Sequence, residues 1–289
     1  MEKEISKAIT IEISNPEKLK ETTEEIKKDG PDKLHILTDF DRTLTTAKVD
    51  GKSMPSLISI LRDGNYLTPD YAAKAHALYN HYAPIEKDLS IPFAERKKAM
   101  EEWWRTHFKL LIKSGLTKSE MDKAIGSGKI KFRDGVQQFL KTLHKANVPV
   151  IIMSSSALGG EAITRYLKKS GHYFDNIKVI SNSFNWDEQG VATSVQEPII
   201  HGLGKDETMI KDFPFFDDVK KRPNVILLGD SEGDTGMVEG FDYNNLIKIG
   251  FLNEDVNKHI EHFKKLYDIT ITNDGTFEPV NNLLSKILS

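Results

Sequence analysis

The sequence predicts an α/β protein with a mostly parallel sheet and helices on both faces. Six short apolar runs recur along the chain, at residues 34–39, 149–153, 177–181, 225–229, 246–250 and 269–272. Stretches with helical spacing lie between most of them, for example at 136–146, 161–171 and 255–266. Several apolar runs end in an acidic or hydroxyl residue. Alternating strands and helices are typical of parallel sheets, which bind ligands at the carboxyl ends of their strands.

The first elements follow from local signals. Asn15 is a good N-cap, and Pro16 suits the first position of a helix that we expect to end at Gly30. The run LHILTD at 34–39 then predicts a buried strand that ends in a carboxylate. Further along, a turn at Gln189-Gly190 between short β-like flanks predicts a small hairpin within 184–194.

One region interrupts the alternation of strands and helices. Between about residues 53 and 127 we find no strand pattern, whereas 70–82 and 94–115 have helical spacing. Thr117 and Glu120 form a capping-box pattern that predicts a further helix. The region therefore reads as a helical module inserted soon after the first buried strand.

The insertion predicts two domains. We expect an α/β core formed by residues 1–50 and 130–289, and a helical cap formed by residues 51–129. The linkers near 49–53 and 126–130 would let such a cap open and close over a site and exclude water from it.

The composition excludes several classes of function. The 289-residue chain carries 40 Lys and Arg against 43 Asp and Glu, so it has no basic excess for nucleic acid or an anionic membrane. It has no cysteine, which excludes disulfides, thiolate metal sites and a cysteine nucleophile. Its mean hydropathy is −0.43, and no apolar run approaches the ~20 residues of a membrane helix. The first residues lack a signal-peptide pattern, so we expect a soluble cytoplasmic protein.

Two carboxylates follow the first buried strand, in the segment DFDRTLT at 39–45. On an extended backbone, Asp39 and Asp41 would point to the same side. Neighbouring acids stay ionised only beside a cation, unless one of them is protonated. The pair therefore suits a Mg²⁺ site with one nucleophilic and one acid/base carboxylate. A surface turn is the simpler alternative, and the preceding buried strand argues against it.

A second acidic segment, GDSEGD at 229–234, follows another apolar run. Asp230 ends that run and Asp234 comes four residues later, while the glycines allow a tight turn. If the two strands are neighbours, Asp230 faces the same crevice as Asp39. The alternative is a glycine-rich turn with solvated acids, and the presence of both motifs disfavours it.

Serine and lysine side chains complete the set of candidates. Ser154, Ser155 and Ser156 follow the apolar run at 149–153, where a hydroxyl and nearby N–H groups can donate to a phosphate oxygen. Lys205 follows two glycines, opens a predicted helix, and could balance the negative charge of the crevice. Taken alone, these are ordinary loop serines and an ordinary surface lysine.

The order of these motifs is a carboxylate pair, a serine, a lysine and a second carboxylate pair, each near a strand end. That order resembles the haloacid dehalogenase superfamily of phosphatases, whose core is Rossmann-like. The resemblance extends to the pyrimidine 5′-nucleotidase family of the cytosolic 5′-nucleotidase III type, over nearly the whole chain from about residue 11 to 288. The matching stretches are DFDRTLT, LLGDSEGDTGM, HYAPIEKD, MEEWWRTHFKLL, NIKVISN, DEQGV and LIKIGFLNEDV.

The resemblance implies a Mg²⁺-dependent 5′-nucleotidase that works through an aspartyl-phosphate. Asp39 would take up the phosphoryl group, and Asp41 would protonate the departing 5′ oxygen and then activate water. Mg²⁺ would be bound by Asp39, the carbonyl oxygen of Asp41 and Asp230. Asp234 would steady the metal's water ligands and the lysine, and Lys205 would neutralise the phosphoryl oxygens.

Two places depart from the family pattern. The loop SSSALGG is serine-rich and longer than usual; counting from the strand favours Ser154 as the phosphate ligand, and counting back from the next helix favours Ser155 or Ser156. We place most weight on Ser154. Arg42 stands where the family commonly has Met, and it either alters access to the site or points outward.

The cap is expected to hold the nucleoside. Glu86 matches a cap glutamate that contacts the nucleoside in the family. Trp103 and Trp104 diverge by about 100° on a helix, so we expect one of them in the core. The resemblance suggests that Trp104 and Phe108, which share a helix face, flank the base. Stacked aromatics beside an acid favour a cationic base, which adds 7-methylguanosine monophosphate to CMP and UMP as candidate substrates. The alternative is two core aromatics and a surface acid.

Other functions remain to be weighed. A phosphoserine phosphatase of the same superfamily would find nothing to stack on the cap aromatics. A non-catalytic nucleotide-binding protein would have no need for the full set of charged residues. A nucleoside 5′-hydroxyl can compete with water for an aspartyl-phosphate, so a phosphotransferase side activity is a further expectation. We expect a monomer whose partner is a nucleoside monophosphate, and neither nucleic acid nor membrane.

Overall fold

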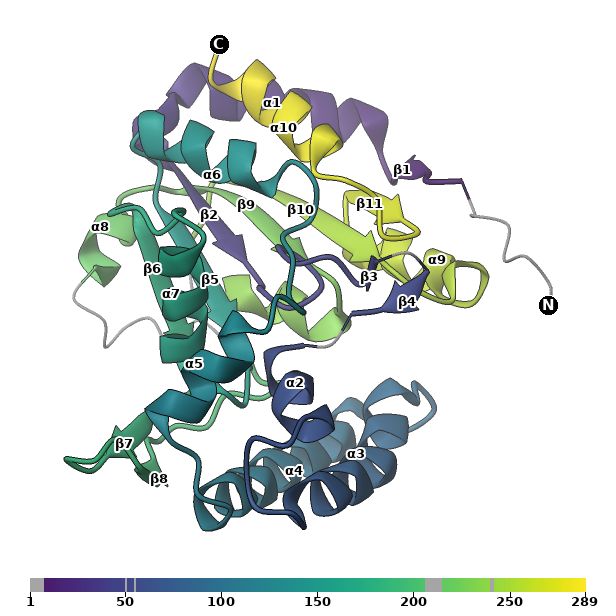
Figure 1. Cartoon of the computed structure of the whole chain (residues 1–289). Helices are drawn as coiled ribbons and strands as arrows, with labels where there is room; N and C mark the ends of the chain where they lie inside the picture. Colours follow the sequence, from purple (N-terminus) through teal and green to yellow (C-terminus); the bar gives the residue numbers. More distant parts are fainter. Residues whose placement is uncertain (1–7, 50, 55, 206–214, 240–241) are drawn as a thin grey trace.

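The computed structural model describes residues 8–49, 51–54, 56–205, 215–239 and 242–289 (Figure 1). Its centre is a seven-stranded sheet of order β1-β11-β10-β9-β2-β5-β6. The strands are β1 (Ile11–Ile13), β2 (Leu34–Thr38), β5 (Val150–Ser154), β6 (Ile177–Ser181), β9 (Asn224–Gly229), β10 (Asn245–Leu252) and β11 (Ile269–Thr272). All neighbours pair in parallel except β1 and β11. The predicted mostly parallel sheet is confirmed, and β1 is an antiparallel edge strand that the sequence did not predict.

Helices cover both faces of the sheet, as predicted. Neighbouring residues in β2 separate the two faces, since Ile36 belongs to one hydrophobic cluster and Leu37 to the other. The Ile36 face packs against α1 (Pro16–Asp29), α6 (Val136–Lys145), α7 (Gly159–Lys169) and α10 (Glu278–Ile287). The Leu37 face packs against α8 (Phe216–Lys220), η3 (Glu232–Val238) and α9 (Val256–Leu266). Burial on both faces explains why the central strands are continuous apolar runs.

Local signals set the helix ends where the sequence places them. The side chain of Asn15 accepts a hydrogen bond from the backbone N–H of Lys18, and α1 ends before Gly30, whose φ is 81°. Thr117 caps α5 (Lys118–Gly126) by accepting from the N–H of Glu120. The helix expected to begin at Lys205 falls on residues 206–214, which lie outside the described part of the chain.

A helical layer lies below the sheet in Figure 1, at the opposite end of the molecule from α1 and α10. It begins after a short hairpin of β3 (Lys48–Val49) and β4 (Lys52–Ser53) and contains α2 (Leu57–Asp63), α3 (Tyr71–Lys87) and α4 (Phe93–Lys113). The last helix of the insertion, α5, packs against α7 of the core. The described part of residues 53–127 thus contains strand only at Ser53, and the division into core and cap stays a prediction.

The predicted hairpin is present as β7 (Phe184–Trp186) and β8 (Ala192–Val195), which pair antiparallel. It lies beside α4, and the ring centroids of Phe184 and Phe108 are 5.6 Å apart. Among the described helices, none combines the length and the apolar character that a bilayer crossing requires.

The buried histidine of α4 predicts a pH-dependent stability. Nε2 of His107 lies 3.0 Å from the hydroxyl oxygen of Tyr71 on α3, and burial lowers the pKa of His107 to about 4. The unfolded chain protonates this ring near pH 6.5, so the contribution is complete above that pH and is lost as pH falls toward 4. We expect the free energy of unfolding to lose up to about 3 kcal/mol over this interval from this one group.

Urea unfolding measured between pH 4 and 7 checks this prediction. The variant His107→Gln keeps an acceptor for Tyr71 and does not titrate, so its stability should fall less steeply below pH 6.5 than that of the parent. His35 and His201 also have pKa values lowered to about 4 by burial, and they act equally in both proteins. Parallel curves for the two proteins would contradict the assignment to His107.

Candidate active site

A cavity of about 410 Å³ lies at the carboxyl ends of β2, β5, β9 and β10, facing the helical layer. Residues that directly follow these strands line it, and the helical layer contributes the end of α3 and part of α4. The predicted site residues among its lining are Asp39, Asp41, Glu86, Ser154, Ser155, Lys205 and Asp230. Parallel strands thus bring together segments that are almost 200 residues apart in sequence.

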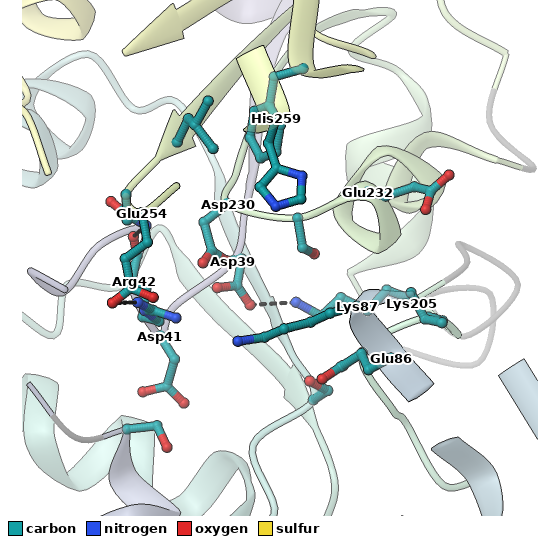
Figure 2. Close-up of a pocket in the computed structure, with 18 of the residues that line it drawn as sticks. Asp39, Asp41, Arg42, Glu86, Lys87, Lys205, Asp230, Glu232, Glu254 and His259 are labelled. Carbon is teal, nitrogen blue, oxygen red and sulfur yellow. Dashed lines mark hydrogen bonds and ion pairs between the residues drawn. The ribbon is translucent and has the colours of Figure 1, made fainter. Parts of the chain in front are cut away.

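Lys205 joins two buried carboxylates at the floor of the cavity. Its Nζ pairs with Oδ1 of Asp39 (Figure 2). The same Nζ lies 2.7 Å from Oδ1 of Asp234. All three side chains are at most 5% exposed. Although burial lowers the pKa of Lys205, the charges of Asp234 and Asp39 raise it above its usual value. The lysine is therefore held as a cation beside the two acids.

Adjacent strands place Asp39 and Asp230 together. β2 and β9 pair in parallel with Thr38 opposite Leu228, and the N–H of Asp39 continues the ladder to the carbonyl of Leu228 at 2.9 Å. Each strand ends here, so both carboxylates open into the same cavity. The expectation that Asp230 faces the same crevice as Asp39 is met by this geometry.

Asp234 organises the loop that follows β9. Its Oδ2 accepts hydrogen bonds from the N–H groups of Asp230 and Ser231, both at 2.9 Å, and from the hydroxyl of Ser231 at 2.8 Å. Its other oxygen binds Lys205, so one carboxylate joins the loop to the cation. The hydroxyl of Tyr267 donates to the carbonyl of Ser231 at 2.6 Å and supports the loop from α9's C-terminal end.

The acids of the site resist ionisation. Burial, reinforced by the charge of Asp234, raises the pKa of Asp230 to about 7. Burial raises the pKa of Asp39, and Lys205 beside it acts in the opposite direction. Lys205 pairs with Asp39 and Asp234, while Arg42, Lys205 and Arg133 oppose the raised pKa of Asp230 through their charges. A divalent cation bound beside these acids would favour their ionised forms.

The oxygen donors fit Mg²⁺. Among the residues that the structure describes, no group of three His, Cys, Asp or Glu side chains is arranged as a metal site. The three residues that the resemblance assigns to the metal, Asp39, Asp41 and Asp230, all line the cavity. A small hard cation that retains several water ligands needs no more than this from the protein.

Asp41 differs from the sequence-based expectation. The strand ends at Thr38, residues 41–44 form turns, and Arg42 has a φ of 65°, so the alternation of an extended backbone does not apply. Figure 2 shows the carboxylate of Asp41 directed away from Lys205. Its Oδ1 accepts a hydrogen bond of 3.4 Å from the N–H of Leu57, the first residue of α2. Burial raises the pKa of Asp41 to about 6, which suits a carboxyl group that gives and takes a proton.

The serine loop lies on the cavity wall. Ser154, Ser155 and Ser156 all line the cavity, and the N–H of Ser156 donates to Oγ of Ser154 at 3.1 Å. Asn182, which sequence reasoning missed, holds this loop by donating to the carbonyls of Ser155 and Ser156, both at 3.3 Å. The geometry leaves the choice among the three serines open.

Arg42 lies at the cavity wall and forms an ion pair with Glu254, Nη2 to Oε1, at 2.6 Å. Its backbone is held by Arg133, which donates to the carbonyl of Arg42 at 2.6 Å and to that of Thr43 at 3.0 Å. Arg133 also forms an ion pair of 2.8 Å with Asp274. Sequence reasoning missed Arg133 because nothing local marks a buried arginine that crosses between distant loops.

Glu86 enters the cavity from the helical layer. It lies near the end of α3, and a Cβ added to Gly202 would stand 2.7 Å from its Oε1, so the carboxylate rests against the loop that leads to Lys205. Burial raises the pKa of Glu86, and Lys87 and Lys205 oppose that shift. The alternative of a solvated surface acid does not describe this residue.

The two aromatic residues assigned to the base lie elsewhere. Phe108 is 1% exposed and packs in the main core against Phe184, so it does not line the cavity. Trp104 is half-buried, is absent from the cavity lining, and donates its indole N–H to the carbonyl of Ser155 at 2.7 Å. Trp103 is 8% exposed and stacks on Tyr82 of α3. The helix face was predicted correctly, but it meets the core and the serine loop rather than the cavity.

Gly233 predicts a large effect for a small substitution. A Cβ at this position would lie 1.9 Å from the carbonyl oxygen of Gly202, because the loops that carry Asp230 and Lys205 touch here through their backbones. We expect Gly233→Ala to cost about 2–3 kcal/mol of stability and, by separating these loops, to reduce the phosphate release that the family resemblance implies.

Thermal unfolding and steady-state kinetics measure both effects. Gly126→Ala is the matched control, since its Cβ would meet only the mobile Nζ of Lys169 at the end of α5. That variant should be as stable as the parent or slightly more so. Equal stabilities for the two alanine variants would show that the loops do not touch as described.

The comparisons with known proteins point to the same family as the sequence resemblance. The family model described as "Pyrimidine 5'-nucleotidase (UMPH-1)" matches residues 42–288. The chain is 31% identical over 280 residues to a "7-methylguanosine phosphate-specific 5'-nucleotidase" of Gallus gallus, covering 96% of each chain. A protein of the same name from Homo sapiens is 31% identical, with 96% of this chain and 93% of that one covered.

Solved structures show the same fold. A crystal structure of cytosolic 5'-nucleotidase IIIB bound to cytidine is similar with a TM-score of 0.87 and 28% identity, covering 96% of this chain and 93% of that one. A phosphoserine phosphatase structure is similar with a TM-score of 0.52 and 18% identity, covering 86% and 97%. The second likeness concerns the fold alone.

Proposed function

The chain belongs to the pyrimidine 5′-nucleotidase family, and on that premise we propose that it is a Mg²⁺-dependent 5′-nucleotidase that carries the phosphoryl group on Asp39. Enzymes of this family are phosphoric monoester hydrolases. The observation that carries the proposal is the buried cluster in which Lys205 joins Asp39 to Asp234 at the ends of β2 and β9.

In the first step, an oxygen of Asp39 attacks phosphorus and the bond from phosphorus to the 5′ oxygen breaks. Asp41 gives its proton to the departing 5′ oxygen, and its pKa of about 6 supports this role near neutral pH. Its carboxyl group must first leave the N–H of Leu57 and turn toward the cavity. Lys205 stabilises the negative charge on the phosphoryl oxygens throughout.

In the second step, water attacks the phosphorus of the aspartyl-phosphate and gives its proton to Asp41. The bond between phosphorus and Asp39 breaks, which releases phosphate and restores both carboxyl groups. Ser154, Ser155 or Ser156 would donate a hydrogen bond to the phosphate from the wall of the cavity. Asp234 keeps Lys205 and the loop of Asp230 in place.

Mg²⁺ would be held by Asp39, the carbonyl of Asp41 and Asp230. When bound, it supplies positive charge that allows an anionic carboxylate to approach a phosphate dianion. The position of Asp39 and Asp230 on one cavity, and the raised pKa of Asp230, support this assignment.

For the nucleoside we propose Glu86 as the contact from the cap, because it lines the cavity beside the loop that leads to Lys205. We retain 7-methylguanosine monophosphate, CMP and UMP as candidate substrates, on the names of the relatives, the cytidine-bound structure and the pyrimidine nucleotidase family model. Phe108 is buried, so its ring does not stack on the base. The indole of Trp104 is bound to the carbonyl of Ser155, so this ring could contact the base only after a movement of the cap.

We also propose that residues 51–129 act as a movable cap on a core of residues 1–50 and 130–289. We propose that the protein is a monomer located in the cytoplasm. The word cytosolic in the name of the cytidine-bound structure supports the proposed location. A transfer of the phosphoryl group from Asp39 to a nucleoside hydroxyl would be a side activity of the same intermediate.

A phosphate-release screen tests the proposed function. Nucleoside 5′-monophosphates, including 7-methylguanosine monophosphate, are compared with phosphoserine, each with Mg²⁺ and after treatment with EDTA. We expect release from at least one nucleotide, a loss of about a hundredfold or more on metal removal, and recovery when Mg²⁺ is added. Faster release from phosphoserine than from every nucleotide would favour the alternative phosphatase, and EDTA-resistant activity would contradict the metal assignment.

A further inference from the structure

Arg96 is a buried arginine that crosses from the cap to the core. It belongs to α4, and its side chain is 5% exposed. Its Nη2 lies 3.0 Å from Oε2 of Glu232, which follows β9 in the predicted core domain. A guanidinium removed from water requires partners for its N–H groups, so this ion pair is not the weak surface kind.

The same guanidinium also holds the cap segment that presents Glu86. Nη1 of Arg96 donates to the carbonyl of Glu86 at 3.2 Å, and Nε donates to the carbonyl of Ile91 at 3.2 Å. These two carbonyls belong to the end of α3 and to the turn that follows it. One planar side chain thus connects the backbone of a nucleoside-contact candidate to the core.

Glu232 lies midway between Asp230 and Asp234 on the loop that carries both acids. Its other oxygen, Oε1, is 3.9 Å from Nε2 of His262 on α9. Both Arg96 and Glu232 line the cavity. A movement of the cap away from the core would therefore break the pair at the edge of the reaction centre.

We propose that the Arg96–Glu232 pair is a clasp that holds the cap closed over the substrate and sets the position of Glu86. The inference rests on the proposed nucleotidase function. Arg96 touches neither the phosphate nor the attacking group in this account, so it is a positioning residue. A nucleotide benefits from closure through its nucleoside, whereas a small phosphate ester without a nucleoside does not.

The test compares Arg96→Met, Glu232→Gln and the double variant in the full-length protein with Mg²⁺. For the best nucleotide substrate, each single variant should raise KM about tenfold and change kcat by less than about threefold. The double variant should resemble the single ones, because each change already opens the clasp. With p-nitrophenyl phosphate, KM should stay within about twofold of the parent.

Arg96→Lys distinguishes the clasp from a structural role. Lysine restores a charge for Glu232 but has no planar group to reach the carbonyls of Glu86 and Ile91 as well. We expect it to recover part of the loss in KM. Arg105→Met is the matched control, because Arg105 on the same helix pairs with Glu197 at 2.6 Å across the same boundary, but both side chains are exposed. This control should leave KM unchanged.

Amide hydrogen exchange gives a readout that does not depend on catalysis. In the clasp variants, exchange should become faster at 84–96 and 230–238, and in Arg105→Met it should not. Unchanged exchange in Arg96→Met, or an equal rise in KM for p-nitrophenyl phosphate, would overturn the clasp. If the parent protein hydrolyses no nucleotide while these segments still loosen in the variants, the proposed function fails and the clasp remains as a contact between cap and core.

Discussion

Replacing Asp39 with asparagine is expected to lower the rate of phosphate release by about four orders of magnitude or more. The amide has the size of the carboxylate but cannot attack phosphorus. The backbone of Asp39 continues the pairing of β2 with β9, and that hydrogen bond is unaffected by the side chain. Because the change removes one of several crowded buried acids, we expect the melting temperature to stay equal or to rise.

Steady-state phosphate release and thermal unfolding of the two proteins check this prediction. Asp268→Asn is a suitable control, since Asp268 accepts from the N–H of Lys248 in the middle of β10 and lies outside the cavity. It should retain activity, whatever it does to stability. If Asp39→Asn kept even a hundredth of the parent rate with pure protein, another group would have to accept the phosphoryl group.

Replacing Lys205 with methionine is expected to affect both activity and stability. Its ammonium group pairs with Asp39 and lies 2.7 Å from Asp234, and no part of this contact is exposed beyond 5%. Without it, buried carboxylates lose their cation, which we expect to cost about 3–5 kcal/mol of stability. The phosphoryl oxygens lose their neutralising charge as well, and we expect about a thousandfold lower activity.

The double variant Lys205→Met/Asp234→Asn separates the two effects. Removing Asp234 together with the lysine takes away one of the two carboxylates that lost their cation, so urea unfolding should recover part of the lost stability. Activity should remain at the level of the single variant because the cation is still missing. A single variant as stable as the parent would show that Lys205 does not bridge the two acids in solution.

Much of the core could be predicted because local sequence and burial agree there. The central strands are apolar throughout because helices cover both faces of the sheet. A continuous apolar run such as 225–229 therefore predicts a buried strand. β1 was missed because it has three residues and a mostly exposed burial pattern, so its pairing with β11 decides its conformation. Caps such as Thr117 are strictly local and were read correctly.

The candidate site was predictable where strand ends determine position, and not where side chains reach across the fold. Asp39 and Asp230 follow from the parallel sheet. The direction of Asp41 depends on a left-handed turn at Arg42, which an acidic pair does not encode. Arg96 and Arg133 find partners more than 80 residues away, so no spacing reveals them. Phe108 shows that the sequence can reveal which residues share a helix face without revealing what that face packs against, which here is Phe184.

The most direct measurement of the central claim is a search for phosphate bound covalently to the protein. The enzyme is mixed with a radiolabelled nucleoside monophosphate and Mg²⁺, quenched in acid within a turnover, digested and mapped. The account predicts a label that hydroxylamine removes, on the peptide that contains Asp39, and none in Asp39→Asn. Label on a different residue, or complete turnover with no labelled protein at any quench time, would contradict it.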